Sequence, residues 1–177
     1  GNAPVGVSAN PSRQEVYVAN SGSNSISVID SINDTVKATI NVDSIPIDIV
    51  TVKDSIYAIN SGSDSITILD VVTKAVKGRI QAGINPRKGI YSEQYNRVYL
   101  SNYSSGEVSF LIPSSAVITR SIKAGEKPVG LAIDESRNRL YITDYSSNKV
   151  VVINSVSEVI EKTIMVGKRP YGIISVK

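Results

Sequence analysis

A motif of sixteen residues recurs four times along this chain, and the repetition constrains the fold more than any other feature. Residues 15–30 read EVYVANSGSNSISVID, and the later copies read SIYAINSGSDSITILD, RVYLSNYSSGEVSFLI and RLYITDYSSNKVVVIN. The markers of the repeat are Pro4, Pro46, Pro86, Pro128 and Pro170, and Tyr17, Tyr57, Tyr99 and Tyr141. Each tyrosine precedes the next proline by 29 residues, whereas proline precedes tyrosine by 13 residues, or by 11 in the second copy. The length difference therefore lies in one loop of the second copy.

Each copy is predicted to form four short β-strands. Runs of β-branched residues with alternating polarity, bounded by Gly, Ser, Asn and Asp, are typical of strands and hairpins, and no helical periodicity competes with them. The first strands are predicted at 5–9, 47–52, 89–92 and 129–133, and the second strands at 15–20, 55–60, 97–102 and 139–144. The third strands are predicted at 25–30, 65–70, 107–112 and 149–154, and the fourth at 36–40, 76–80, 118–122 and 160–164.

The residue that closes each second strand is Asn or Asp, at positions 20, 60, 102 and 144. Such side chains form hydrogen bonds with the backbone two residues further on, and these bonds stabilise tight turns. We therefore expect these four side chains to hold the hairpin turns that follow them.

A single sheet of four strands with apolar residues on both faces is not stable alone, because its flanks remain in water. Radial stacking lets each sheet cover the next, which predicts an all-β fold, a β-propeller of four-stranded antiparallel blades. The predicted blades span about 4–45, 46–85, 86–127 and 128–169, and 170–177 is predicted to be the inner strand of a further blade. The repeated tyrosines are predicted to pack between blades.

The repeat also resembles a known family. The segments that carry the similarity are PVGV, PVGL and PYGI, the following YVAN and SVID, and the ending KTIMVG. Through them the chain is similar, over its whole length, to the YVTN β-propeller repeat. The third copy departs from it, because PRKGI moves the glycine by one place and Pro113 ends the third strand, which predicts an irregular edge there. The resemblance implies a secreted or cell-surface protein, of the kind found in surface layers, with a more distant relation to lactonase-like propellers.

Three arrangements of the blades agree with the sequence. The chain is a part of a longer propeller, a closed ring of four blades, or half of an eight-bladed ring formed by two copies. Residues 1–85 carry six basic and eight acidic groups, and residues 86–177 carry thirteen and eight, so the two halves have opposite net charge. Attraction between the acidic half of one copy and the basic half of another would help two copies to complete a larger ring by self-association. Dispersed surface charge without such a role is the preferred explanation of the asymmetry.

Composition limits the function. The chain has no histidine and no cysteine, which removes the commonest general base, the commonest metal ligand and thiolate chemistry. We therefore expect a protein that is not an enzyme, with no cofactor. The formal net charge of +3, without aromatic residues interleaved among the basic ones, argues against a nucleic-acid partner. No stretch of eighteen apolar residues is present, so no membrane span is predicted.

Three sets of residues are candidates for sites. Loops at the channel mouth carry a basic set that could bind an anionic sugar or an acidic protein, namely Arg87, Lys88, Lys123, Lys127, Lys168 and Arg169. Three carboxylates, Asp43, Asp48 and Asp64, could together hold Ca²⁺, which takes six to eight oxygen ligands. Asn33 starts the acceptor pattern Asn-Asp-Thr for N-glycosylation in a turn that we expect to be exposed. In each case, ordinary solvated side chains are the competing interpretation.

The sequence therefore predicts a non-catalytic extracellular or cell-surface propeller, a rigid scaffold or recognition module for a protein or glycan partner. The alternative is a part of a larger propeller enzyme, lactonase-like or metal-dependent, whose catalytic groups lie mostly outside this chain. Because no histidine is present, that alternative requires a carboxylate or a lysine as the base.

Overall fold

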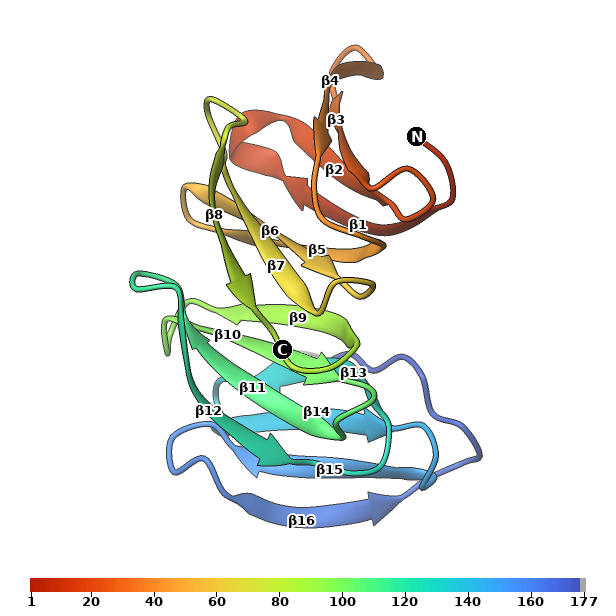
Figure 1. Cartoon of the computed structure of the whole chain (residues 1–177). Helices are drawn as coiled ribbons and strands as arrows, with labels where there is room; N and C mark the ends of the chain where they lie inside the picture. Colours follow the sequence, from red (N-terminus) through yellow and green to blue (C-terminus); the bar gives the residue numbers. More distant parts are fainter. Residues whose placement is uncertain (176–177) are drawn as a thin grey trace. The chain divides into compact units, whose positions relative to one another are not determined.

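The computed structural model describes residues 1–175 and divides the chain into two compact units, Gly1–Gln81 and the part that begins at Ala82 (Figure 1). The described residues form sixteen strands and one 3-10 helix, η1 (Pro11–Arg13). The strands make four separate antiparallel sheets of four strands each, with neighbours in chain order. The predicted all-β class, with four-stranded antiparallel blades, is confirmed.

The first unit contains two of these sheets, which we call blades 1 and 2. Blade 1 comprises β1 (Pro4–Asn10), β2 (Glu15–Asn20), β3 (Ser25–Asp30) and β4 (Thr35–Asn41). Blade 2 comprises β5 (Pro46–Val52), β6 (Ser55–Asn60), β7 (Ser65–Asp70) and β8 (Val76–Gln81). Every one of these strands overlaps the segment predicted for it.

The second unit contains blades 3 and 4. Blade 3 comprises β9 (Pro86–Ser92), β10 (Arg97–Asn102), β11 (Glu107–Ile112) and β12 (Val117–Lys123). Blade 4 comprises β13 (Pro128–Asp134), β14 (Arg139–Asp144), β15 (Lys149–Asn154) and β16 (Ile160–Met165). A proline is the first residue of the first strand of each blade, which we call the inner strand (β1, β5, β9 and β13). At this place the missing N–H of proline does not interrupt the hydrogen bonds between strands. The strand β11 ends directly before Pro113. The pairing of β11 with β12 contains a bulge, but the third and fourth strands of the other blades have a bulge at the same place, so this irregularity is not specific to the third copy.

Within each unit the two blades pack face to face through apolar side chains. In the first unit, the core joins Tyr17 and Ile26 of blade 1 to Ile56 and Leu69 of blade 2. In the second unit, Tyr99 and Phe110 of blade 3 belong to one core with residues of blade 4, among them Leu131, Leu140, Ile142 and Val151. The rings of Tyr99 and Phe110 meet edge to face, with centroids 5.2 Å apart. The prediction that repeat tyrosines pack between blades therefore holds for Tyr17 and Tyr99.

The residues that close the second strands do not act as predicted. The Nδ2 atom of Asn20 donates to the hydroxyls of Ser25 and Ser27 in β3, and Asn60 donates likewise to Ser65 and Thr67. These bonds cross to the third strand, whereas we expected bonds to the backbone two residues on. The turns that follow contain instead one residue with left-handed backbone, namely Asn24, Asp64, Gly106 or Asn148. Asn, Asp and Gly adopt that conformation at low cost.

The predicted inner strand at 170–177 is not assigned as a strand over Pro170–Ser175, and Val176 and Lys177 lie outside the described residues. The segment nevertheless lies beside β13. The hydroxyl of Thr143 is 3.0 Å from the carbonyl oxygen of Tyr171, and the hydroxyl of Ser175 donates to the carbonyl of Ile133 at 2.7 Å. The first bond repeats the one that Ser101 of blade 3 makes to the carbonyl of Val129 in blade 4. The segment therefore contacts blade 4 as β13 contacts blade 3.

The described residues contain no helix with the length and apolar character that a membrane span requires.

Candidate ligand-binding site

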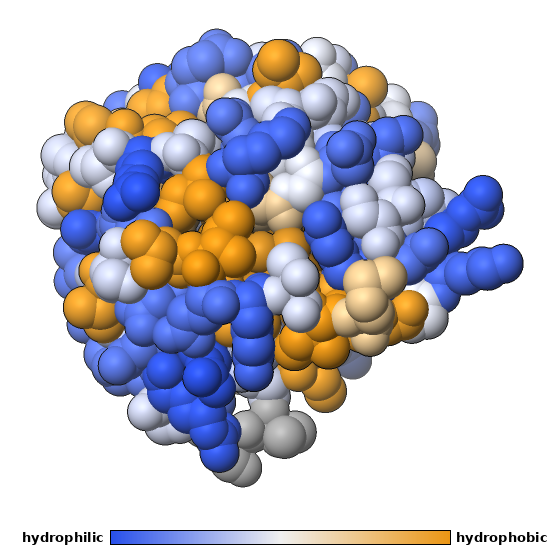
Figure 2. All heavy atoms as spheres, turned by 90° about the horizontal axis from the view of Figure 1, so that it is seen from below, coloured by the Kyte–Doolittle hydropathy of each residue, from blue (hydrophilic) through white to orange (hydrophobic). Residues whose placement is uncertain are grey.

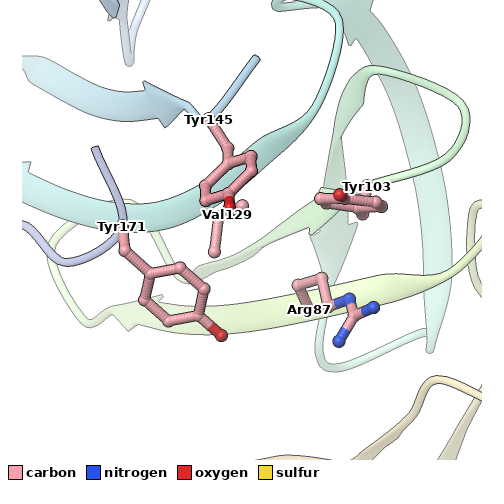
Figure 3. A pocket seen from close by; sticks show the side chains of 5 residues that line it. All are labelled: Arg87, Tyr103, Val129, Tyr145 and Tyr171. Atoms are coloured by element: carbon pink, nitrogen blue, oxygen red, sulfur yellow. The ribbon is translucent and has the colours of Figure 1, made fainter. Parts of the chain in front are cut away.

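The second unit carries an aromatic hollow that the sequence did not reveal. It has a volume of about 270 Å³ and is lined by Arg87, Tyr103, Val129, Tyr145 and Tyr171 (Figure 3). We call it the tyrosine hollow. These residues occupy two places of the repeat: Arg87, Val129 and Tyr171 each follow the marker proline, and Tyr103 and Tyr145 each follow the residue that closes a second strand. Packing of blade 3 against blade 4 brings both kinds of position together.

Cations stack on the rings of this hollow. The Arg87 guanidinium lies 5.0 Å from the centroid of the Tyr103 ring, and the Lys127 ammonium lies 5.2 Å from the same centroid. The Arg169 guanidinium lies 5.8 Å from the centroid of Tyr145. The rings of Tyr145 and Tyr171 are 6.5 Å apart at 85°. Such cation–π contacts contribute roughly 0.5–2 kcal/mol each and fix the orientation of the rings.

A second hollow adjoins the first and shares the Tyr145 ring. Its volume is about 360 Å³, and it is lined by Lys127, Tyr145, Ser146, Asn148, Lys168 and Arg169. We call it the basic hollow. Two backbone contacts hold its loops: the Arg169 N–H donates to the side-chain oxygen of Asn148 at 3.0 Å, and the Lys127 N–H donates to Asp144 at 3.0 Å.

Asp144 fixes the loop that carries Lys127. Its carboxylate is fully buried and accepts from the backbone N–H groups of Glu126 and Lys127, both at 3.0 Å. Burial raises the pKa of Asp144. These two hydrogen bonds, a hydrogen bond from Ser147 and the charge of Lys149 together outweigh burial, so that the pKa lies below its usual value. The carboxylate is therefore ionised at neutral pH, and it orients the loop without facing a ligand.

The structure divides the predicted basic set. Four members, Arg87, Lys127, Lys168 and Arg169, either line a hollow or stack on a tyrosine that does. Lys88 and Lys123 line neither hollow. The Lys123 ammonium donates to the carbonyl of Ser105 at 2.8 Å, and the backbone N–H of Lys88 donates to the Ser101 hydroxyl.

The three aspartates of the predicted calcium site have different surroundings. Asp43 bonds to Arg79 at 2.8 Å and to Ser65 at 2.8 Å, Asp48 is 3% exposed in β5, and Asp64 lies in the turn after β6. Burial raises the pKa of Asp43. Hydrogen bonds from Arg79, Ser65 and Thr67 and the charge of Arg79 together outweigh burial, so that the pKa lies below its usual value. Among residues 1–175 no group of three or more carboxylates could hold a metal ion, so these aspartates do not form the cluster that the calcium prediction needs. The Asn33 acceptor is exposed, in the turn between β3 and β4.

A third hollow lies at the opposite ends of β9 and β13. Its volume is about 720 Å³, and its lining residues are Ile90, Tyr91, Gln94, Ile133, Asp134, Glu135, Ser136, Arg137 and Ser175. Its acidic groups are already bonded within the protein: Asp134 accepts from Ser136 and Arg137, and Glu135 accepts from Ser92 at 2.6 Å. Hydrogen bonds from Ser136 and Arg137 lower the pKa of Asp134 to about 2. We therefore place the candidate site at the tyrosine hollow.

The repeat pattern does not predict the tyrosines of the hollow, because only the strand tyrosines recur in all four copies. A signal was present in the turns. Copies one and two have Ser21 and Ser61 where copies three and four have Tyr103 and Tyr145. An aromatic residue in an exposed turn, where the repeat otherwise has serine, indicates a role outside the core.

The four sheets and their pairwise packing define the blades of a β-propeller. The chain is similar to hydrazine synthase from Kuenenia stuttgartiensis, with a TM-score of 0.83 and 18% identity over 91% of this chain and 48% of that one. It is also similar to virginiamycin B lyase from Staphylococcus aureus, with a TM-score of 0.82 and 13% identity over 97% of this chain and 59% of that one.

The chain thus spans about half the length of these neighbours, and at such identities the likeness concerns the fold alone. No protein-family model and no curated protein sequence matches the chain.

Proposed function

We propose that the chain is a non-catalytic recognition module, in which the blades form a rigid scaffold and the tyrosine hollow binds a protein or glycan partner. The observation that carries the proposal is the pair of cations, Arg87 and Lys127, stacked on Tyr103 beside two further tyrosines. Aromatic residues and arginine are the side chains most enriched at binding surfaces. Among the described residues, neither the tyrosine hollow nor the basic hollow is lined by a carboxylate, which supports a binding role over acid–base catalysis.

The test compares the full chain with the variant Tyr103→Ser/Tyr145→Ser. Serine stands at both equivalent places in copies one and two, at Ser21 and Ser61, so the repeat accommodates it. Binding to a defined panel of purified polysaccharides and acidic polypeptides is measured by calorimetry. We expect at least one panel member to bind the full chain and to lose ten-fold or more in affinity with the variant. Equal binding by both proteins contradicts the proposal, and release of new reducing ends from a bound glycan contradicts its non-catalytic part.

We place this module outside the cell or at the cell surface. The resemblance of the repeat to the YVTN family supports this location, and the exposed Asn33 acceptor is compatible with it. Antibody labelling of intact against permeabilised source cells tests the location. Labelling that requires permeabilisation contradicts it.

Self-association is a second element of the proposal. All six residues of β16 are exposed, among them Ile160, Ile164 and Met165, and blade 1 exposes Val5 and Val7. Figure 2 views the molecule from the side on which β16 lies in Figure 1, and it shows apolar patches between hydrophilic side chains. Apolar surface of this kind marks protein contacts. Light scattering is expected to give a mass above 18.9 kDa, and a monodisperse species of 18.9 kDa contradicts self-association.

The alternative function is a part of a larger propeller enzyme, lactonase-like or metal-dependent, with its catalytic groups mostly elsewhere. The likeness to a lyase of which this chain covers 59% favours it. Incubation of the full chain with virginiamycin B, with and without added Mg²⁺ or Ca²⁺, tests one such activity. Conversion of virginiamycin B would favour the enzyme over the binding module.

A further inference from the structure

We propose that the ligand of the second unit is an acidic glycan, a sugar chain with carboxylates on its rings, which lies across the tyrosine hollow and the basic hollow. The inference rests on the proposed function and specifies its partner. Both hollows share the Tyr145 ring, so one ligand can contact them together. The combined surface offers aromatic faces at one end and three basic side chains at the other.

The tyrosine hollow has the form that a sugar ring requires. Tyr103, Tyr145 and Tyr171 surround it, as Figure 3 shows, and its floor includes Val129, which is 5% exposed. A pyranose has an apolar face of C–H groups that packs on an aromatic ring, and a polar edge of hydroxyl groups. A volume of about 270 Å³ lies just below the roughly 300–1,000 Å³ of typical small-molecule sites, which suits one sugar ring at a time.

Arg87 adds an unused hydrogen-bond donor. Its Nε atom is buried and has no partner among the described residues, although its guanidinium is fixed against Tyr103. A buried donor without a partner destabilises the protein, and a hydrogen bond to a ligand oxygen would remove that cost. A hydroxyl or carboxylate of a sugar in the hollow supplies such an oxygen.

The charges of the site favour an acidic sugar over a neutral one. Arg87, Lys127, Lys168 and Arg169 form no ion pair within residues 1–175, whereas Lys74, Arg79, Arg137 and Arg139 are all paired. Carboxylates near unpaired cations gain attraction that is not offset by the loss of another partner. Arginine also matches the planar carboxylate with two parallel hydrogen bonds.

An acidic polypeptide would use only half of this site. It would satisfy the four cations, but it has no need of three tyrosine rings around an apolar floor. A neutral glycan would use the rings but leave the cations unpaired. An acidic glycan uses both, and blades 1 and 2 lack the combination, since Val5, Ile47, Ser21 and Ser61 stand at the corresponding positions.

The experiment measures binding of the full chain to oligogalacturonate by calorimetry at low and physiological salt. We expect binding that weakens at least ten-fold with the fully methyl-esterified oligomer, which keeps the rings and lacks the charges. Binding should also weaken at least ten-fold with Tyr103→Ser/Tyr145→Ser and with Lys127→Gln/Lys168→Gln. The matched control, Lys53→Gln/Lys162→Gln, removes two exposed lysines that line neither hollow and is expected to bind like the unmodified chain.

Thermal unfolding verifies that each variant is folded, and the lysine variant keeps the test valid if the tyrosine variant is not. Equal binding of the esterified and free oligomers overturns the inference, but leaves the proposed function intact if the tyrosine variant still loses affinity. Tighter binding of polyglutamate or dextran sulfate, or no binding of oligogalacturonate, also overturns the inference. The proposed binding role is overturned as well if every panel member binds the tyrosine variant with the same affinity as the full chain.

Discussion

The Lys74 ammonium lies 2.5 Å from a carboxylate oxygen of Glu15, and the two residues belong to different blades of the first unit. Glu15 begins β2 of blade 1, and Lys74 lies in the loop between β7 and β8 of blade 2. The same carboxylate accepts from the Tyr17 hydroxyl at 2.6 Å, and the Lys74 ammonium also lies 5.4 Å from the centroid of the Tyr17 ring. This polar cluster therefore joins the two blades beside their apolar core.

Replacement of Lys74 by Met is expected to destabilise the protein by about 3 kcal/mol or more, because it leaves the buried charge of Glu15 without its main partner. The matched control is Lys77→Met, which removes an exposed lysine 3.7 Å from Asp70. An exposed pair of this kind contributes about 1 kcal/mol or less. Urea unfolding of both variants decides the matter, and similar losses would show that the Glu15 pair contributes no more than a surface pair.

The same cluster predicts a pH dependence. Burial raises the pKa of Glu15. The hydrogen bonds from Lys74 and Tyr17, together with the charges of Lys74 and Arg13, outweigh burial, so the folded-state pKa lies below 4.5. A group with a lowered folded pKa stabilises the protein above its unfolded pKa, and this contribution is lost as the pH falls through the folded pKa. Between pH 5 and pH 3 the unmodified chain should lose more stability than Lys74→Met does. Equal losses, measured by urea unfolding at each pH, would contradict this.

In blade 4, a hydrogen bond that the other three blades share is missing. Asn20, Asn60 and Asn102 donate to a hydroxyl seven residues further on, in Ser27, Thr67 and Ser109. Blade 4 has Asp144 and, seven residues further on, Val151, which is 1% exposed and offers no hydroxyl. The two differences, Asp in place of Asn and Val in place of Ser or Thr, depend on each other. An Asn at position 144 beside Val151 would bury a side-chain N–H group without an acceptor.

We therefore expect Asp144→Asn to cost about 1–3 kcal/mol. In the double variant Asp144→Asn/Val151→Thr, the new hydroxyl can accept from the new amide, as Thr67 does in blade 2. The double variant should be at least about 1 kcal/mol more stable than the sum of the two single effects predicts. Additive losses in a double-mutant cycle by chemical denaturation would show that the two positions are independent.

Ile45 has a left-handed backbone, with φ of 53°. The corresponding residue of the next copy is Asn85, with φ of 56°, and Asn tolerates this region far better than a β-branched residue. Ile45→Asn is therefore expected to stabilise the first unit by about 1 kcal/mol, since the side chain is already 46% exposed. Ile32→Asn is the control, because Ile32 is exposed without a left-handed backbone. A rise in the melting temperature for both variants, or for neither, would contradict the argument.

The sequence was sufficient to predict the strands but not the site. Strand positions follow from local alternation and from prolines that recur at a nearly fixed spacing, and both are visible along the sequence without knowledge of the fold. The tyrosine hollow depends on contacts between blades 3 and 4, which bring Arg87 beside Tyr103 and Tyr145 beside Tyr171. Four of the six predicted cations do line the two hollows. They stand close to the marker prolines, and these recur in loops at the same end of each blade. The sequence does not predict the surroundings of the three aspartates, because Asp43 pairs with Arg79, 36 residues away, and only the fold brings these two residues together.

The glycine that follows the marker proline by two residues leads to the last prediction. Gly6 lies in β1, and a Cβ atom at this position would lie 2.5 Å from the carbonyl oxygen of Ile47 and 2.7 Å from the Cα of Asp48, in β5 of the next blade. Gly6 does not have a positive φ, so the constraint is space and not conformation. The absence of a side chain allows the inner strands of blades 1 and 2 to approach closely.

Gly6→Ala is therefore expected to separate these two strands and to cost about 1–3 kcal/mol, the usual range for overpacking. Gly78→Ala in β8 is the matched control, because a Cβ atom there would have no neighbour within 4 Å. That change should be neutral or stabilise by about 0.4–1 kcal/mol, since alanine restricts the unfolded chain. The two urea midpoints are thus predicted to differ, with only that of Gly6→Ala clearly below the midpoint of the unmodified chain. Coincident midpoints would mean that the inner strands can move apart freely, and that the repeated glycine has another cause.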